Sequence, residues 1–426
     1  MINTQDKYWF GKAPGHWSTV RVKSLFRLAC ESSKENHGME LLSVYTDIGV
    51  RPRKELEQKG NKASTTDGYW LVREGDLVVN KLLAWMGAIG YSEYNGVTSP
   101  AYDILRARTT FINPKFYHYL FRLKLTQGEF RRWSKGIMDM RLRLYFSELG
   151  NVFIPCPPLS EQNAIVEFID NENDRIDKLL EKKKKLISII KLREESFIKD
   201  CLTGRDLKYI DLKETTVPWL GKIPAHWRTM RLRHLVRIAT GGKDTKDRVD
   251  NGDYPFYVRS MKIERINSFS MNEESVLTSG DGAGVGEVFH HVFGKFDLHQ
   301  RMYAFTNFRE VSGDYFYYFL MAFFKMQMSQ WSAKSTVDSV RMPFLKTMVF
   351  TVPPKEEQER IVDKIKKQSG KYHDLIWKTE ESIRLLKEFR NSLITEVVTG
   401  RLDIKLWKKR GSTDKRLDNI EGVMRT

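Results

Sequence analysis

The chain has 426 residues, 41% hydrophobic and 12% aromatic, which is enough material for two hydrophobic cores. Its 71 Lys and Arg exceed its 54 Asp and Glu, giving a formal charge of +17. This surplus favours a polyanionic partner, above all nucleic acid, although composition alone leaves a basic protein of unrelated function equally open. Three widely spaced cysteines (Cys30, Cys156 and Cys201) argue against a disulfide framework and against a cysteine-rich zinc site. With no apolar signal core and no run near the ~20 apolar residues of a membrane span, we expect a reduced, cytoplasmic protein.

Several segments occur twice. Residues 9–21 recur as 219–231, residues 157–162 as 353–358, and residues 203–205 as 399–401. The offset is 210 between His16 and His226 and 196 between Glu161 and Glu357. This period is too long for a solenoid, so it indicates two copies of a globular block followed by a helix. Such a chain is suited to reading two sites at a fixed spacing.

In chain order, residues 13–156 form the first block. Short β-like runs at 41–44, 70–72, 76–79 and 102–105 precede a helical stretch after Pro114. The second block, from about 223 to 352, repeats this plan with strands near Val276 and Val288 and a helix over 315–328. Both read as mixed α/β without the regular alternation of a doubly wound sheet.

Each block is followed by a long helix with a heptad-like apolar seam. The seam residues are Ile165, Ile169, Ile176, Leu179, Leu186, Ile190 and Phe197 in the first, and Ile361, Ile365, Tyr372, Leu375, Leu386, Phe389 and Leu393 in the second. Ser160 is the predicted N-cap of the first helix and Gly204 its C-cap. Each helix would measure about 60 Å at 1.5 Å per residue. The two must pack antiparallel, and both seams break at one equivalent step, Lys183 and Thr379.

We therefore predict an α+β protein with two pseudo-symmetric globular α/β domains separated by two long antiparallel coiled-coil helices. The predicted boundaries are 1–156 for the first globular domain, 157–204 for the central helix, 205–352 for the second globular domain, 353–401 for the distal helix, and 402–426 for a basic C-terminal tail.

The glycine-rich run 279–286 could cradle a nucleotide such as S-adenosylmethionine. No long apolar strand precedes it, and neither Pro157-Pro158 nor Pro353-Pro354 continues into the aromatic residue that an amine-methylating motif needs. A tight turn with a close backbone approach is the preferred interpretation. His290 and His291 would point to opposite faces of a strand, so we predict no metal site. We find no catalytic constellation, and predict no catalytic, metal or cofactor residue in this chain.

Two corresponding segments, 131–143 and 331–342, place Trp-Ser, Lys, Asp and Arg at the end of each block. Such basic, hydroxyl-rich loops can contact phosphates and fork onto guanine edges, or they can be solvated loops whose Asp caps a turn. The predicted DNA-binding residues are Asn80, Lys81, Arg131, Arg132, Lys135, Arg141, Arg143, Arg301, Lys334, Ser335 and Arg341. The lysine run 182–185 is interpreted as a solvated helix face, with contact along a DNA backbone as the alternative.

The pattern resembles the specificity subunit of type I restriction–modification enzymes over nearly the whole chain. It is carried by Ile223-Pro224 with His226-Trp227, by the Pro-Pro-x-x-Glu-Gln starts at 157 and 353, and by Leu202-Thr203-Gly204-Arg205. Val79-Asn80-Lys81 with Gly87-Ala88 and residues 99–102 resembles one type of target-recognition domain, and residues 279–289 another. Ala13 and Lys355 depart from the family pattern.

The resemblance implies that each domain reads one half of a bipartite target in double-stranded DNA. It implies that the helices set the spacing and dock two modification (methyltransferase) subunits. S-adenosylmethionine, ATP and Mg²⁺ are then expected on partner subunits, and the chain itself is non-catalytic. Whether two restriction (translocase–nuclease) subunits also join is left open. The alternatives are a related methyltransferase complex without a translocase, a stand-alone coiled-coil binder of DNA or RNA, and an enzyme that uses the glycine-rich loop.

Overall fold

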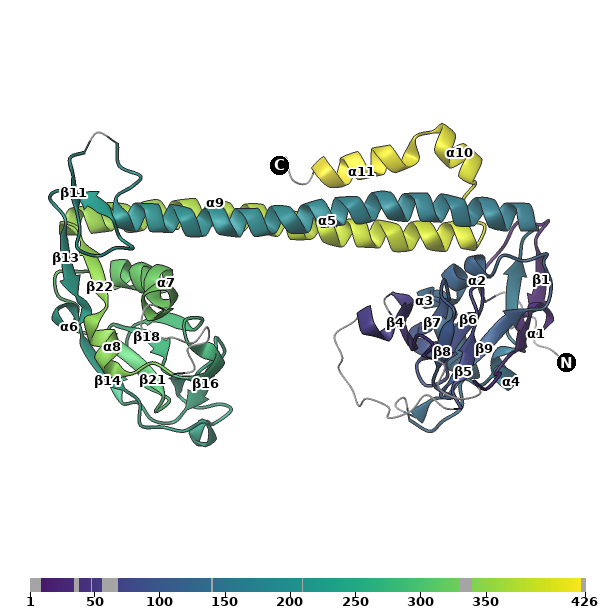
Figure 1. The fold of residues 1–426 in the computed structure, drawn as a ribbon, viewed down its shortest axis with the longest axis horizontal. Coiled ribbons are helices and arrows are strands. Elements are labelled where there is room, and N and C mark those ends of the chain that lie inside the picture. Colours follow the sequence, from purple (N-terminus) through teal and green to yellow (C-terminus); the bar gives the residue numbers. More distant parts are fainter. Residues whose placement is uncertain are drawn as a thin grey trace. The chain divides into compact units, whose positions relative to one another are not determined.

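A computed structural model describes residues 9–33, 38–46, 48–55, 68–138, 141–208, 210–329 and 339–422. The chain forms two compact units. Unit 1 comprises Met1–Lys183 and Thr379–Thr426, and unit 2 comprises Lys184–Lys378. Both contain sheets and helices, and two long helices run through both units, as the α+β prediction requires (Figure 1). No helix among the described residues is long and apolar enough to cross a membrane.

Unit 1 is built on a four-stranded sheet with the order β2-β9-β6-β7, in which all neighbours are antiparallel. Its strands are β1 Ser18–Arg21, β2 Phe26–Leu28, β3 Leu42–Tyr45, β4 Gly49–Pro52, β5 Trp70–Val72, β6 Leu77–Asn80, β7 Ile89–Tyr91, β8 Gly96–Thr98, β9 Tyr102–Ala107 and β10 Phe153–Cys156. Its shorter helices are α1 Val22–Leu25, α2 Pro114–Phe121, α3 Lys124–Trp133, α4 Phe146–Leu149, α10 Ile404–Lys409 and α11 Ser412–Gly422. The strands predicted near 42, 70, 77 and 102 and the helix after Pro114 are all present.

Unit 2 repeats the central sheet with the order β14-β21-β18-β19 and adds a second four-stranded sheet, β16-β15-β20-β17. Its strands are β11 Leu212–Glu214, β12 Lys222–Pro224, β13 Arg228–Arg231, β14 Arg237–Thr240, β15 Tyr254–Tyr257, β16 Ile263–Ile266, β17 Met271–Asn272, β18 Ser275–Ser279, β19 Phe289–Val292, β20 Lys295–Leu298, β21 Met302–Thr306 and β22 Val349–Val352. Its shorter helices are α6 Leu232–Leu235, α7 Gly313–Ser329 and α8 Met342–Thr347. The second sheet has no counterpart in the described part of unit 1, so the two blocks share a frame but differ inside.

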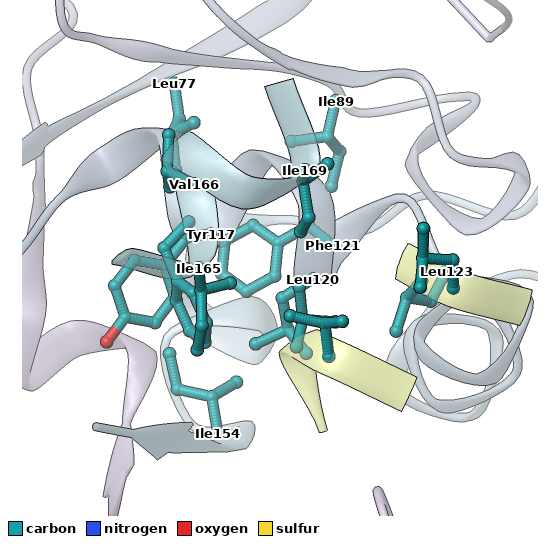
Figure 2. Packing of buried hydrophobic residues seen from close by; sticks show 14 of the residues in the cluster. Leu77, Ile89, Tyr117, Leu120, Phe121, Leu123, Ile154, Ile165, Val166 and Ile169 are labelled. Atoms are coloured by element: carbon teal, nitrogen blue, oxygen red, sulfur yellow. The ribbon is translucent and has the colours of Figure 1, made fainter. Parts of the chain in front are cut away.

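The long helices are α5 (Leu159–Thr203) and α9 (Lys355–Val398). Within unit 1 the beginning of α5 shares a buried cluster with the end of α9, through Ile165 and Ile169 on one and Leu393 and Val397 on the other. The helices are therefore antiparallel. Figure 2 shows Ile165, Val166 and Ile169 of α5 among Tyr117, Leu120 and Phe121 of α2, so the helix is part of the unit's core rather than an appendage. Each such buried aliphatic side chain is worth about 1.5–3 kcal/mol.

The first helix begins at Leu159, two residues earlier than an N-cap at Ser160 implies. Ser160 is not the N-cap, because Leu159 is already helical and the Pro158 carbonyl accepts hydrogen bonds from the backbone of Glu161 (2.9 Å) and Gln162 (3.0 Å). The C-cap prediction is correct. Gly204 adopts φ +74°, and the Arg205 amide donates to the Asp200 carbonyl at 3.0 Å, which together form a Schellman ending.

In unit 1 a residue that follows α9 contacts the beginning of the chain. In unit 2 a residue that follows α5 makes the same kind of contact with the segment after it. The Arg401 guanidinium donates to the Phe10 carbonyl at 3.1 Å, and the Arg205 guanidinium donates to the Leu220 carbonyl at 3.3 Å. A Cβ on Gly400 would collide with Pro14, and one on Gly204 would collide with Pro224. The repeated Gly-Arg and Pro residues thus hold the helix ends against the globular blocks.

The segment predicted as a basic tail, 402–426, instead contains the helices α10 and α11. Leu417 and Ile420 of α11 are buried in the core of unit 1, because their spacing puts both on one helical face. The Glu421 carboxylate of α11 lies 2.7 Å from the Lys183 ammonium. The polar seam residues Lys183 and Thr379 are both buried, and Lys183 pairs with a residue of α11.

Candidate nucleic-acid interface

The predicted basic loop of unit 1 lies beside the connection between β6 and β7. Asn80, the last residue of β6, is buried and its side-chain oxygen accepts from the Leu82 amide at 3.0 Å. The Leu144 amide then donates to the Lys81 carbonyl at 2.9 Å. Lys135 and Arg143 pair as an antiparallel bridge, which closes the loop into a hairpin-like projection. The structure therefore brings Lys81, Lys135 and Arg143 into one region of the unit.

Unit 2 has the same arrangement at equivalent positions. The Val340 amide donates to the Gly280 carbonyl at 2.8 Å, and Ser339 forms a bridge with Asp281 in the connection between β18 and β19. Val340 stands 196 residues after Leu144, the same offset that relates the two long helices. In both units the end of the basic segment is thus hydrogen-bonded to the connection that follows the central strand of the main sheet.

Several predicted DNA-binding side chains in unit 1 already have protein partners. Lys81 donates to the Pro100 carbonyl at 2.8 Å and lies 3.4 Å from the Asp103 carboxylate. Arg132 is held by Glu129 through two hydrogen bonds of 2.8 and 2.9 Å. The Arg131 guanidinium stacks over the Trp85 ring, 5.2 Å from its centroid.

Lys135 forms an ion pair with Glu148, and this hydrogen bond, together with one from Ser147, lowers the pKa of the Glu148 carboxyl. Arg141 and Arg143 of the same loop are exposed. The loop also presents apolar residues to solvent, since Ile137 is 100% exposed and Met138 53%. The solvated part of this surface therefore mixes arginines with aliphatic groups, both of which can contact base edges.

In unit 2, Arg341 is exposed at the N-cap of α8, whereas Lys334 and Ser335 lie outside the described residues. Arg301 is exposed and forms an ion pair with Asp281. Asp281 also accepts from Arg259 at 2.9 Å. Arg259 was not predicted from the sequence, because it stands 22 residues before its partner, in a bend that follows a strand of the other sheet, and no local motif marks it.

The glycine-rich run forms a tight turn, as preferred in the sequence interpretation. It contains the 3-10 turn η6 (Gly282–Gly284), and the Gly280 amide donates to the Arg301 carbonyl at 2.8 Å. A Cβ on Gly280 would lie 2.8 Å from that carbonyl oxygen, so the close approach requires glycine.

The two neighbouring histidines of β19 have separate surroundings. The ring centroid of His290 lies 5.0 Å from that of Tyr257, whereas His291 is hydrogen-bonded to Glu274 at 2.8 Å. Desolvation lowers the pKa of His290. No group of three or more His, Cys, Asp or Glu side chains able to hold a metal ion occurs within the described ranges.

The sequence of this chain is similar to those of several known proteins. The family model for the type I restriction modification DNA specificity domain matches residues 224–383. The type I restriction enzyme EcoDI specificity subunit of Escherichia coli is 25% identical over 192 residues, 45% of this chain and 42% of that protein. The match thus spans less than half the length of that relative. The MjaVIII specificity subunit of Methanocaldococcus jannaschii is 21% identical over 434 residues, 92% of this chain and 95% of that protein.

Residues 224–383 thus match the type I specificity domain, and the chain as a whole is similar to type I specificity subunits. Its fold is also that of solved specificity subunits. A chain from a structural study of assembly and conformational transition of the type I R-M system superposes with a TM-score of 0.70 at 17% identity, covering 92% of this chain and 100% of that one. The HsdS subunit of Thermoanaerobacter tengcongensis gives a TM-score of 0.51 at 16% identity, covering 92% and 98%. The shared fold consists of two sheet-rich units and two long helices.

Proposed function

We propose that this specificity subunit reads a bipartite DNA target, one half-site per unit, and that α5 and α9 set the spacing and dock two methyltransferase subunits. The chain contributes no catalysis under this proposal. S-adenosylmethionine binds to the methyltransferase subunits, and ATP and Mg²⁺ bind to any restriction subunits that join. Both units use double-stranded DNA as the ligand.

The observation that carries the proposal is the matched placement of the basic loops. The Leu144 amide bonds to the Lys81 carbonyl and the Val340 amide to the Gly280 carbonyl. Lys81 and Gly280 are each the first residue after the equivalent central strand, β6 or β18. Equivalent loops occupy equivalent positions on the sheets of both units, and this supports the same kind of function for both. The loops hold exposed Arg141 and Arg143 in unit 1 and Arg341 in unit 2, and the formal charge of the chain is +17. These features fit attraction to phosphates combined with contacts to base edges.

The interiors of the units support two different half-sites. Unit 2 has the additional sheet β16-β15-β20-β17 and an acidic Asp281 beside its central strand, whereas unit 1 has Lys81 next to the end of the equivalent strand. Different side chains on equivalent connections would present different hydrogen-bonding groups to DNA.

The test is methylome sequencing of a host with and without this chain, in the presence of its methyltransferase subunit. We expect methylated adenines at one bipartite motif only when the chain is present. Replacing residues 205–352 by the equivalent block of a relative should change one half of the motif and leave the other half unchanged. The proposal fails if methylation does not depend on the chain, or if the assembled complex binds the motif and random duplexes with equal affinity.

A further inference from the structure

Asp281 holds two arginines at the candidate interface of unit 2. Its Oδ1 accepts from the Arg259 Nη1 at 2.9 Å, and its Oδ2 accepts from the Arg301 Nη1. The Asp281 side chain is 16% exposed, whereas Arg259 is 42% and Arg301 59% exposed. The carboxylate is thus sheltered and the two guanidinium groups are open to solvent. Burial alone would raise the pKa of Asp281, but the hydrogen bonds from Arg301 and Arg259 lower it, so the carboxylate stays charged.

The backbone around this trio is fixed at several points. Asp281 is bridged to Ser339, and the Gly280 amide donates to the Arg301 carbonyl at 2.8 Å. The Arg301 amide in turn donates to Nδ1 of His299, at 3.1 Å, and His299 is buried. The backbone positions of Asp281 and Arg301 are therefore fixed by the connections between strands. The orientation of the two side chains is set before a ligand binds.

Each arginine retains donors for a ligand. Asp281 accepts from a single Nη of each guanidinium, and the remaining nitrogens of Arg259 and Arg301 have no hydrogen-bond partner among the described residues. Hollows of about 360 and 280 Å³ adjoin them, one lined by Arg259 and the other by Arg301, and Asp281 lines both. A guanidinium fork matches the N7 and O6 acceptors that guanine presents in the major groove.

The charge of the trio decides between reading a base and binding a phosphate. Two arginines and one aspartate carry a net charge of about +1, so the carboxylate weakens the attraction of the pair for the DNA backbone. A carboxylate that lowers the attraction of two arginines for phosphate but fixes their direction is suited to the reading of bases. The arginines then lose fewer rotamers on binding, and this favours a directional contact. At the equivalent connection of unit 1, Lys81 donates to the Pro100 carbonyl and lies 3.4 Å from Asp103.

We propose that the half-site read by unit 2 contains two guanines, one contacted by Arg259 and one by Arg301, with Asp281 as the positioning residue that aligns both. This inference rests on the proposed function and specifies it. It assigns base identity to unit 2 only.

The experiment uses the assembled complex of the full chain with its methyltransferase subunits and the motif mapped by methylome sequencing. Each guanine of the half-site is replaced in turn by 7-deazaguanine, which lacks the N7 acceptor, or by inosine, which keeps N7 and O6 and lacks only the minor-groove amino group. Two positions should lose about ten-fold in affinity with 7-deazaguanine and less than about two-fold with inosine.

Variants assign the two contacts. Arg259→Lys and Arg301→Lys preserve charge but remove the fork, so each should relax discrimination at one guanine by about 5- to 100-fold and leave affinity for random duplexes unchanged. Asp281→Asn keeps the side-chain shape and removes the charge that holds both arginines. It should weaken discrimination at both guanines while affinity for random duplexes stays equal or rises. Arg228→Lys, at an exposed position of β13, serves as the matched control.

The outcomes separate the two levels of the argument. If the wild-type complex does not distinguish the motif from a scrambled duplex, the proposed function itself fails. If it distinguishes them, but 7-deazaguanine has no effect at any guanine or the lysine variants weaken random and specific duplexes alike, the arginines bind phosphates and the inference is overturned. Circular dichroism and methyltransferase co-purification of each variant confirm that folding and assembly are intact.

Discussion

The indole of Trp17 donates to the Glu161 carboxylate at 2.9 Å, and the indole of Trp227 donates to the Glu357 carboxylate at 2.7 Å. In both units the neighbouring histidine also bonds the glutamate, at 2.9 Å. Each pair joins the start of a block to the first turn of the long helix that follows it. Desolvation would raise the pKa of Glu357, but the hydrogen bonds from Trp227 and His226 lower it. The repeated His-Trp and Glu-Gln residues are thus two sides of one contact.

Removing either carboxylate should destabilise its own unit. We expect Glu161→Ala or Glu357→Ala to reduce the free energy of unfolding by about 1–3 kcal/mol, because a largely buried indole N–H loses its acceptor. Gln at either position retains an acceptor and should cost less. Amide hydrogen exchange would localise the effect, with exposed Glu167→Ala as the control on the same helix. Equal effects of Gln and Ala would contradict an acceptor role.

The stability of unit 1 should depend on His118. Burial, with Arg122, Lys115 and Arg51 nearby, lowers the pKa of this imidazole to about 3, and its Nδ1 accepts from the Tyr91 amide at 3.1 Å. The pKa of His118 in the folded state lies below its value near 6.5 in the unfolded state. Between these two pH values the unfolded state therefore binds more protons than the folded state. Stability is therefore complete above about pH 6.5 and falls by up to about 1.4 kcal/mol per unit as pH drops toward 3. Denaturant titrations of wild type and His118→Gln should show the shallower slope for the variant; parallel slopes would exclude His118.

The exposed basic loops should bind DNA largely through charge. Alanine at Arg131, Lys135, Arg141, Arg143, Lys334 and Arg341 should weaken binding to DNA and leave assembly with partners intact. Each lost phosphate contact should reduce the slope of log affinity against log salt by about 0.9. Arg341→Ala alone should cost about 1–3 kcal/mol of discrimination if it contacts a guanine edge. Unchanged affinity in the six-fold variant would show that the loops do not bind DNA.

Matched insertions in the long helices should change the gap between half-sites. Seven residues, about two turns, added to both α5 and α9 lengthen each helix by about 10 Å, the rise of roughly three base pairs. The methylated motif should gain a correspondingly longer gap. An insertion in α5 or α9 alone shifts one seam against the other and should disrupt assembly. An unchanged gap after matched insertions would mean that the helices serve only to bind partners.

The ion pair between buried Lys183 and partly exposed Glu421 should be sensitive to loss of one partner. Glu421→Ala leaves a largely buried ammonium without this carboxylate and should destabilise unit 1 by about 1–3 kcal/mol. Lys183→Leu in the same background replaces the charge by an apolar seam residue and should restore most of that loss. Thermal unfolding of the three variants measures the cycle, and additive effects of the two substitutions would show that the pair is not coupled.

The periodicity of apolar residues in the sequence was sufficient to predict the long helices. The seam residues from Ile165 to Phe197 are buried or half-buried in one continuous helix, since a sustained heptad pattern has few alternatives. The N-cap prediction was wrong because the helix already begins at Leu159, so Ser160 lies inside its first turn. The C-terminal segment was read from its charge, whereas Leu417 and Ile420 determine that it folds as a helix. Arg259 could not be found because its partnership with Asp281 depends on sheet pairing. The roles of the predicted DNA-binding residues stay predictions.

The meeting of the chain ends in unit 1 bears on the order in which the protein can fold during synthesis. Unit 2 is one uninterrupted stretch, Lys184–Lys378, and contains all its own contacts once that stretch has emerged. Unit 1 needs Arg401 against Phe10, a pairing across 391 residues, and needs α11 over its core. Its first 183 residues emerge first but wait for the last 48. The earliest part of the chain to be made is therefore the last to be completed, and a message truncated near its end would leave the N-terminal recognition unit unfinished.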